Sequence, residues 1–486
     1  MSTWTTFVDE ARIAAQSVLD AATGAFDPTI RLGVTGLSRA GKTVFITALV
    51  HALTQGGRLP VFRAQAEGRI IGGRLSPQPD DTVPRFDIES HLADLGGAER
   101  RWPTSTRQIS ELRLTIDFQS ERRFARANSR LTLDIVDYPG EWLLDLPLLT
   151  LSYAEWSAQT IAASRVGSRD TLAGPWRAHL ETLEAGSTEN EEAARTAARL
   201  FTAYLKAGRD DRYALSILPP GRFLMPGDLE GSPSLTFAPL MLSPGEAANS
   251  GTLHAMMERR YEAYKSKVVR PFFTDHFARL DRQIVLVDAL AAFNAGPQAI
   301  KDLETALASV LSAFRVGANT WMSSLFRPKI EKILFAATKA DHLHHEAHDR
   351  LEAILRRLAD RAIARSHHAG ATIDVVALAS LRATREATVR QGRKTMPCII
   401  GVPIAGERSA TETFDGETEV AVFPGDLPED PESIFSAGFT GLEAGTQGGV
   451  DYRFVRFRPP AIKAGDPLPH IRLDRALEFL IGDRLA

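Results

Sequence analysis

The chain has 486 residues, of which 44% are hydrophobic and 24% charged, and its formal net charge is −3. This balance is ordinary for a water-soluble globular protein and excludes the strong positive charge of most nucleic-acid-binding proteins, so no nucleic-acid partner is expected. No stretch of about 18 uncharged apolar residues occurs, so the chain is expected to have no membrane-spanning helix of its own. The single cysteine, Cys398, is expected to be a buried thiol in a protein of the reducing cytoplasm.

Residues 1–24 predict an amphipathic helix. Apolar side chains recur at helical spacing through Phe7, Ala11 and Val18, while acidic residues interrupt any apolar run of the kind found in secretory signals. We expect this helix to pack on the main domain. A helix that binds a membrane or a partner is the alternative.

The most specific motif runs from Gly36 to Thr43 and has the G-x-x-x-x-G-K-[ST] spacing of a phosphate-binding loop. It lies between an apolar segment at 30–34, which predicts a strand, and residues 44–53, which predict a helix. In this context Lys42 is expected to contact the β- and γ-phosphates, and the Thr43 hydroxyl to bind Mg²⁺. The residues predicted to bind nucleotide here are Ser38, Arg39, Ala40, Gly41, Lys42, Thr43 and Val44.

Further along the chain, residues 56–108 are rich in Gly, Pro and Arg and predict a long irregular segment. The alternation of predicted strands and helices that follows is typical of a parallel sheet with right-handed crossovers. The predicted elements are strands at 111–118, 131–136, 283–290, 332–337 and 373–379, and helices at 298–322 and 342–367.

The expected fold class is therefore α/β: a P-loop NTPase with a doubly wound, mostly parallel sheet, a helical insertion and a small C-terminal β-rich extension. Residues 141–282 show mostly helical spacing, and the extension has a hairpin signal at 413–417 and a closing helix at 474–485. The expected domains are the N-terminal helix (1–24), the nucleotide-binding domain (25–140 and 283–394), the insertion (141–282) and the extension (395–486).

The sequence Asp137-Tyr138-Pro139-Gly140 ends the predicted strand at 131–136. Ligands of doubly wound sheets bind at the carboxyl ends of the strands. We therefore expect Asp137 to reach Mg²⁺, through water, and the Gly140 N–H to contact a γ-phosphate. Asp134 is the competing carboxylate and ranks lower because it lies inside the strand.

The sequence Thr338-Lys339-Ala340-Asp341 follows the predicted strand at 332–337. The Asp341 carboxylate can accept hydrogen bonds from N1–H and the exocyclic amine of guanine, whereas adenine presents an acceptor at N1 and would be rejected. The stem of Lys339 can lie over the base. Ser380, in the small-residue turn after the next strand, is expected to offer a backbone N–H to the guanine carbonyl.

The order of these motifs resembles that of guanine-nucleotide-binding proteins. More narrowly, the motifs at 33–43, 101–107 and 137–142, together with Val287-Asp288 and Asn294-Ala295-Gly296, resemble the bacterial YcjX-type family over most of the chain. The resemblance implies a stress-associated GTP-binding protein with a helical insertion. It also implies a partnership with an inner-membrane protein encoded beside it, and peripheral attachment to that membrane through the partner.

Two positions depart from ordinary GTPases. Glu141 stands where a glutamine orients the attacking water, and Thr338 stands in place of the usual Asn. Because a carboxylate at Glu141 is poorly suited to a transition state that is already negative, hydrolysis is expected to be slow.

The segment from Arg100 to Arg107 is expected to supply catalytic groups. Thr104 would complete the Mg²⁺ shell, with Thr106 as the alternative, and Arg101 has a spacing to Thr104 that resembles the in-cis arginine finger of heterotrimeric Gα subunits. Arg100 and Arg107 are rivals for that role. The alternatives are a solvated basic turn, arginines that pair with acidic residues elsewhere, and an arginine supplied by a partner. The predicted catalytic residues are thus Arg101, Thr104 and Lys42, and the predicted magnesium ligands Thr43, Asp137 and Thr104.

The leading hypothesis is a GTP-binding switch that uses GTP, GDP and Mg²⁺ and hydrolyses GTP slowly. A small-molecule kinase built on the same loop is one alternative, and a nucleotide-binding module without turnover is another. Base preference separates the switch from the kinase. Multiple-turnover phosphate release separates it from the module.

Overall fold

The structure is a computed structural model, and the predicted helix at 1–24 lies outside the residues that it describes. The described residues are 28–37, 39–97, 99–104, 108–121, 128–210, 212–243, 245–313, 330–366, 371–391, 394–408, 412–435, 455–463 and 465–486.

A seven-stranded sheet forms the centre of the molecule, in the order β2-β3-β4-β1-β5-β6-β7. Strands β4, β1, β5, β6 and β7 are parallel, and β2 and β3 are antiparallel at one edge. The predicted doubly wound, mostly parallel α/β fold is therefore confirmed. The strands are β1 (Thr29–Gly36), β2 (Ile70–Ser76), β3 (Ser110–Phe118), β4 (Ser129–Asp137), β5 (Arg282–Val287), β6 (Lys332–Ala337) and β7 (Thr372–Ala377).

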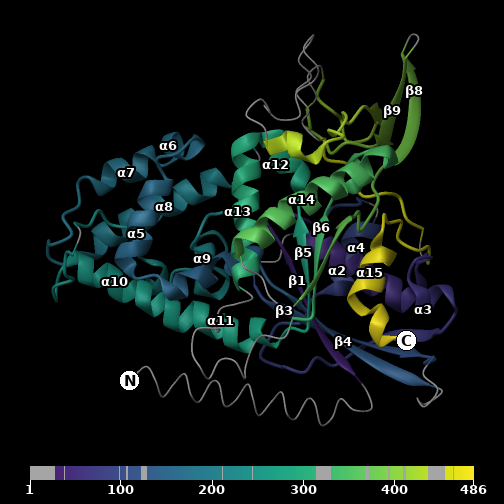
Figure 1. The fold of residues 1–486 in the computed structure, drawn as a ribbon, viewed down its shortest axis with the longest axis horizontal. Coiled ribbons are helices and arrows are strands. Elements are labelled where there is room, and N and C mark those ends of the chain that lie inside the picture. The colour runs from purple at the N-terminus through teal and green to yellow at the C-terminus, as the bar shows by residue number, and fades with distance from the viewer. Residues whose placement is uncertain are drawn as a thin grey trace.

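Helices cover both faces of this sheet, because its central strands are apolar on both sides. One face packs on α2 (Lys42–His51), α4 (Ile88–Gly96) and the C-terminal helix α15 (Leu473–Ile481). The other face packs on α12 (Ala289–Ala295), α13 (Pro297–Ala313) and α14 (His348–Ser366). Figure 1 shows α13 and α14 on one side of the strands and α2 and α15 on the other.

A helical region between β4 and β5 extends the second of these layers. It begins with a 3₁₀ segment, η2 (Gly140–Thr150), and its buried side chains continue the core formed with α12, α13 and α14. In Figure 1 these helices gather at the end of the molecule away from α15. They are α5 (Tyr153–Ala163), α6 (Ser168–Leu172), α7 (Gly174–Leu180), α8 (Glu191–Gly208), α9 (Gly221–Leu224), α10 (Leu253–Tyr264) and α11 (Arg270–Asp275).

The prediction of a long irregular segment at 56–108 is wrong. The segment contains α3 (Arg63–Ala66), the edge strand β2 and the helix α4, whose N-cap Asp87 accepts a hydrogen bond from the Ser90 N–H. Strand β2 has two glycines and is largely exposed, so it lacks the alternation by which a strand is recognised. Pairing with β3, a tertiary contact, forms it.

A second predicted boundary also differs. The strand predicted at 283–290 ends at Val287, because Asp288 caps α12 and accepts a hydrogen bond from the Ala291 N–H.

The C-terminal extension contains a three-stranded antiparallel sheet with the order β10-β9-β8. Its strands are β8 (Arg385–Gln391), β9 (Lys394–Gly401) and β10 (Val420–Val422), so this sheet begins before the predicted boundary at residue 395. Cys398, on β9, is a buried free thiol, as predicted. The division of the chain into domains stays a prediction.

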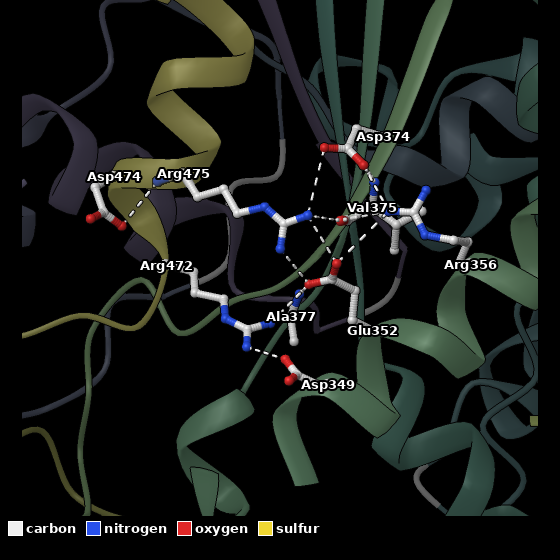
Figure 2. A network of polar contacts seen from close by, with 9 residues as sticks. All are labelled: Asp349, Glu352, Arg356, Asp374, Val375, Ala377, Arg472, Asp474 and Arg475. Carbon is white, nitrogen blue, oxygen red and sulfur yellow. Dashed lines mark hydrogen bonds and ion pairs between the residues drawn. The ribbon is translucent and has the colours of Figure 1, made fainter. Parts of the chain in front are cut away.

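The closing helix α15 is held to the main sheet by a network of ion pairs around Glu352 of α14. Arg475 donates two hydrogen bonds of 2.9 Å to its carboxylate, and Arg472 donates one of 2.8 Å. Arg472 also pairs with Asp349. Figure 2 shows both arginines reaching from the C-terminal segment toward Glu352. The end of the chain is thereby tied to α14 and β7.

Candidate nucleotide-binding site

The predicted site residues follow strands that end at one edge of the sheet. In the register, Val34 of β1 lies opposite Asp137, Gly36 opposite Leu286, and Val287 opposite Ala337. Because these strands are parallel, the loops after β1, β4, β5, β6 and β7 emerge side by side. The fold thus brings the phosphate-loop residues, Asp137 and the 338–341 motif to one edge.

The loop between β1 and α2 makes the tight turn that its glycines predict. Gly41 has a φ of +78° and Arg39 a φ of +59°, both in the left-handed region. The Leu37 N–H donates to Leu286 O at 3.1 Å, which joins the loop to β5. Helix α2 begins at Lys42 directly after this turn, so its N-terminal N–H groups have the orientation that binds phosphate.

The remaining loop residues differ in exposure. Arg39 and Gly41 are exposed, Ala40 and Thr43 buried, and Val44 half-buried. Ser38 lies outside the described residues.

The Lys42 ammonium donates to Asp137 Oδ1 at 2.8 Å, and both side chains are largely buried. The second oxygen, Asp137 Oδ2, is buried without a hydrogen-bond partner in the described part of the chain. The Thr43 hydroxyl lies on the first turn of α2, one residue from Lys42. A carboxylate and a hydroxyl are hard oxygen donors of the kind Mg²⁺ prefers, so these residues fit a magnesium ion held beside a bound phosphate.

The competing carboxylate, Asp134, is occupied elsewhere. It accepts two hydrogen bonds, of 2.6 and 2.8 Å, from the guanidinium of Arg113 on the neighbouring strand β3. This bidentate pair leaves Asp137 as the carboxylate beside the phosphate loop.

Gly140 lies directly against the phosphate-loop strand. A Cβ added to it would lie 2.4 Å from Gly36 O and 2.8 Å from Gly36 C, closer than any side chain can approach a rigid backbone. Glycine at this position lets the segment after β4 touch the start of the loop.

Glu141 is buried and paired with an arginine of the helical region. Arg209, the residue after α8, places Nη2 3.2 Å from Glu141 Oε1. Beside it, the Arg222 guanidinium lies 3.3 Å from the centre of the Trp142 ring, a cation–π contact, and burial lowers the pKa of this arginine. The motif Gly140-Glu141-Trp142 is thus enclosed by the helical region.

A buried carboxyl lies one turn further along η2. Asp145 accepts hydrogen bonds from the Gly221 N–H at 2.7 Å and the Tyr264 hydroxyl at 2.5 Å. Burial raises the pKa of Asp145 to about 7, although these two hydrogen bonds oppose the shift. Burial also raises the pKa of the Tyr264 hydroxyl. Asp145 therefore ties η2 to both α9 and α10.

The motif after β6 forms a turn whose polar groups are partly engaged. Lys339 has a φ of +60°, and its ammonium pairs with Asp288, the N-cap of α12. The Asp341 carboxylate is buried, and its Oδ2 accepts a hydrogen bond of 2.9 Å from the Ala383 N–H. The Thr338 N–H donates to Val287 O at 2.9 Å, which aligns the turn with β5.

The turn after β7, which includes the half-buried Ser380, is backed by the C-terminal segment. Ala379 and Ile471 exchange two backbone hydrogen bonds of 2.8 and 3.1 Å.

His342, which follows the 338–341 turn, is buried against Phe457 of the extension, with ring centroids 5.7 Å apart. Burial lowers its pKa, so the ring is neutral at pH 7.

The predicted catalytic segment is described up to Thr104. The Arg101 guanidinium pairs with Asp94 of α4 at 2.7 Å and is 72% exposed. Thr104 is exposed. Between them, Trp102 donates its indole N–H to Phe457 O at 2.6 Å, which joins this segment to the extension. Thr106 and Arg107 lie outside the described residues.

Sequence reasoning did not single out Arg209, Arg222, Asp288 or Phe457 as partners of the site. Asp288 was within reach of the sequence, because it follows β5 as Asp137 follows β4. Arg209, Arg222 and Phe457 carry no local signal, since they reach the site from regions far along the chain.

A parallel sheet, a Gly-rich turn before a helix N-terminus, and a lysine paired with an aspartate from the adjacent strand together define a P-loop NTPase-like protein. The chain belongs to the YcjX-like family, DUF463, whose model matches residues 30–485.

Two curated relatives are similar over nearly their whole length. A protein of Escherichia coli named Ras-like GTPase YcjX is 39% identical over 471 residues, which cover 94% of this chain and 96% of that protein. A protein of Shewanella oneidensis with the same name is 34% identical over 489 residues, covering 94% of this chain and 95% of that protein. Within the described residues, no helix is both long and apolar enough to cross a bilayer.

Proposed function

We propose that this protein binds GTP and GDP with Mg²⁺ and hydrolyses GTP slowly as a molecular switch. The observation that carries the proposal is the Lys42–Asp137 pair of 2.8 Å beside the Gly-rich turn, at the sheet edge that also holds Asp341. The names of the two relatives, Ras-like GTPase, support the guanine base and the reaction class.

In this proposal, the phosphates contact Lys42 and the backbone of the loop residues Ser38 to Val44, with Gly140 at the γ-phosphate. Thr43, Asp137 and Thr104 hold Mg²⁺, and Lys339, Asp341 and Ser380 contact guanine. Because the Asp341 Oδ2 already accepts the Ala383 N–H, its other carboxylate oxygen is the one available to the base.

Arg101 has the weakest support among the proposed catalytic residues. Its ion pair with Asp94 would have to break before the guanidinium could reach a phosphate. The role in stress and the inner-membrane partner rest on the family resemblance alone, and the cytoplasmic location rests on the single cysteine; we propose them on those grounds.

The test is isothermal titration calorimetry of GTP, GDP and ATP with the full chain in the presence of Mg²⁺. We expect ATP to bind about 100-fold or more weakly than GTP, because adenine leaves the Asp341 carboxylate facing a lone pair. Equal affinities would contradict the proposal and favour the kinase. GTP binding without multiple-turnover phosphate release would favour the module.

The Lys42→Ala variant tests the phosphate contact. Loss of a charged hydrogen bond predicts a GTP affinity about 10- to 100-fold lower. Lys267→Ala, which removes an exposed lysine of the helical region, is the matched control and should bind as the wild type does. Because Lys42→Ala also leaves Asp137 buried without its cation, its melting temperature is measured alongside. A folded variant with unchanged affinity would refute the assignment.

A further inference from the structure

A recess lies between the phosphate loop and the helical region. Its walls contain Leu37 and Arg39 from the loop and Asp288 from the end of β5. Arg209 and Ser216 line it from the side of α8. One arginine of the helical region therefore borders the same space as the phosphate loop.

Tertiary contacts hold this arginine in place. The Arg209 N–H donates to Leu205 O at 3.2 Å, which continues α8 by one residue. Its guanidinium contacts Glu141 Oε1 at 3.2 Å and Met225 Sδ at 3.3 Å. The Arg209 side chain is 21% exposed and the Glu141 side chain 10%, so the pair is largely shielded from solvent, while Arg209 also borders the recess.

The position of Glu141 favours a cation beside it. Glu141 follows Gly140, whose backbone touches Gly36 at the start of the phosphate loop. A terminal phosphate bound by this loop would add negative charge close to a carboxylate that is itself shielded from water, and like charges in such a place repel strongly. Arg209 is the cation that the fold supplies there.

We propose that Arg209, in place of Arg101, is the catalytic arginine of this protein, held by Glu141 and directed at the terminal phosphate from the helical region. The inference rests on the proposed GTP hydrolysis. In that reaction the oxygen of water bonds to the γ-phosphorus while the bond to the β–γ bridging oxygen breaks. One water proton moves to a phosphate oxygen, and GDP and dihydrogen phosphate leave. The Arg209 guanidinium donates to the γ-phosphate oxygens, where negative charge builds up.

The other arginines near this edge of the sheet make different contacts. Arg101 pairs with Asp94 and is mostly exposed. Arg222 covers the Trp142 ring and donates to Pro226 O at 3.2 Å. Arg39 borders the recess from the loop itself and is the closest rival.

The test is single-turnover hydrolysis at saturating GTP and Mg²⁺, with GDP affinity measured on the same samples. We expect Arg209→Ala to lower the rate at least about 100-fold and to leave GDP affinity within about twofold, because GDP lacks the phosphate that Arg209 contacts. Arg195→Ala, which removes an exposed arginine of α8, is the matched control and should keep the wild-type rate. Arg209→Lys keeps the charge but not the two-pronged donor, and its rate should fall about 10-fold. It also provides the test if Arg209→Ala does not fold.

A double variant separates catalysis from simple neutralisation of Glu141. If Arg209 only offsets the carboxylate, Glu141→Gln combined with Arg209→Ala will hydrolyse GTP as fast as Glu141→Gln alone, and the proposal falls. We expect the double variant to stay about 100-fold slower. An Arg209→Ala rate equal to wild type, with the loss found in Arg39→Ala or Arg101→Ala, also overturns it.

The two proposals fail differently. A wild-type chain that does not bind GTP refutes the proposed function. A chain that binds GTP, but releases phosphate independently of Arg209 or not at all, overturns the catalytic role of Arg209 and leaves GTP binding standing.

Discussion

The buried Asp145 carboxyl gives the stability of the helical region a defined pH dependence. Its pKa is raised from 3.8 to about 7 by burial, so the folded protein keeps a proton that the unfolded chain loses. Stability therefore falls as pH rises through this window, because the folded state binds more protons than the unfolded state. The difference of about 3 between the two pKa values corresponds to about 4 kcal/mol in total.

The perturbation is Asp145→Asn, which is nearly isosteric. The asparagine carbonyl can still accept the Gly221 N–H, and its amide can donate to the Tyr264 hydroxyl in place of the present bond. The variant has no titrating group here. Between about pH 4.5 and pH 7.5, the wild type should lose about 3 kcal/mol of unfolding free energy relative to the variant.

The assay is urea denaturation at several pH values, followed by tryptophan fluorescence. Trp156 and Trp176 are buried in the core that also contains Leu144 and Leu146, the neighbours of Asp145, so their fluorescence reports the unfolding of that core. Asp228→Asn, an exposed aspartate of the helical region, is the control and should follow the wild-type pH dependence. Parallel curves for Asp145→Asn and wild type would refute the reasoning, because Asp145 would then have the same pKa in both states.

Three further predictions concern the site and its support. Asp341→Asn should weaken GTP binding and favour xanthine nucleotide, whose extra oxygen can accept a hydrogen bond from the new amide. If calorimetry shows that the variant still prefers GTP over xanthine nucleotide by the wild-type margin, the guanine assignment is contradicted. Gly140→Ala should lower GTP affinity at least about 10-fold, since its Cβ must push the 140 segment away from Gly36, and an unchanged affinity in the same titration would show that this contact is not needed. Glu352→Gln should lower the unfolding free energy by about 1–3 kcal/mol, because Arg475 loses a charged, partly buried partner. If urea denaturation shows no change, the network contributes as little to stability as an exposed surface ion pair.

Local patterns determined much of the fold. Short apolar runs and alternating apolar residues placed β1, β3, β4, β6 and β7 close to their observed bounds, because both patterns are local and need no long-range information to recognise. They did not reveal β2, which is exposed and glycine-containing and exists through its pairing with β3.

At the candidate site, too, local sequence patterns predict some features and tertiary contacts decide the others. The loop around Lys42, the carboxylate Asp137 and the turn at 338–341 follow from spacing, since each lies directly after a strand and parallel strands end at one edge. The sequence favoured Asp137 over Asp134 as the magnesium ligand because Asp134 lies inside the strand. In the structure Asp137 pairs with Lys42 and Asp134 with Arg113, and the magnesium assignment stays a prediction.

The side-chain contacts around Glu141 and Arg101 are decided by tertiary structure alone. The sequence singles out Glu141, because it stands where a glutamine is usual. Its partner Arg209 lies directly after α8, and no local pattern links the two positions. Arg101, singled out by its spacing to a threonine, pairs with Asp94 instead. Spacing along the chain determines which residues follow a strand. Which side chains then meet depends on how the helical region and the extension pack against the sheet, and that packing is set by hydrophobic surfaces spread over the whole chain.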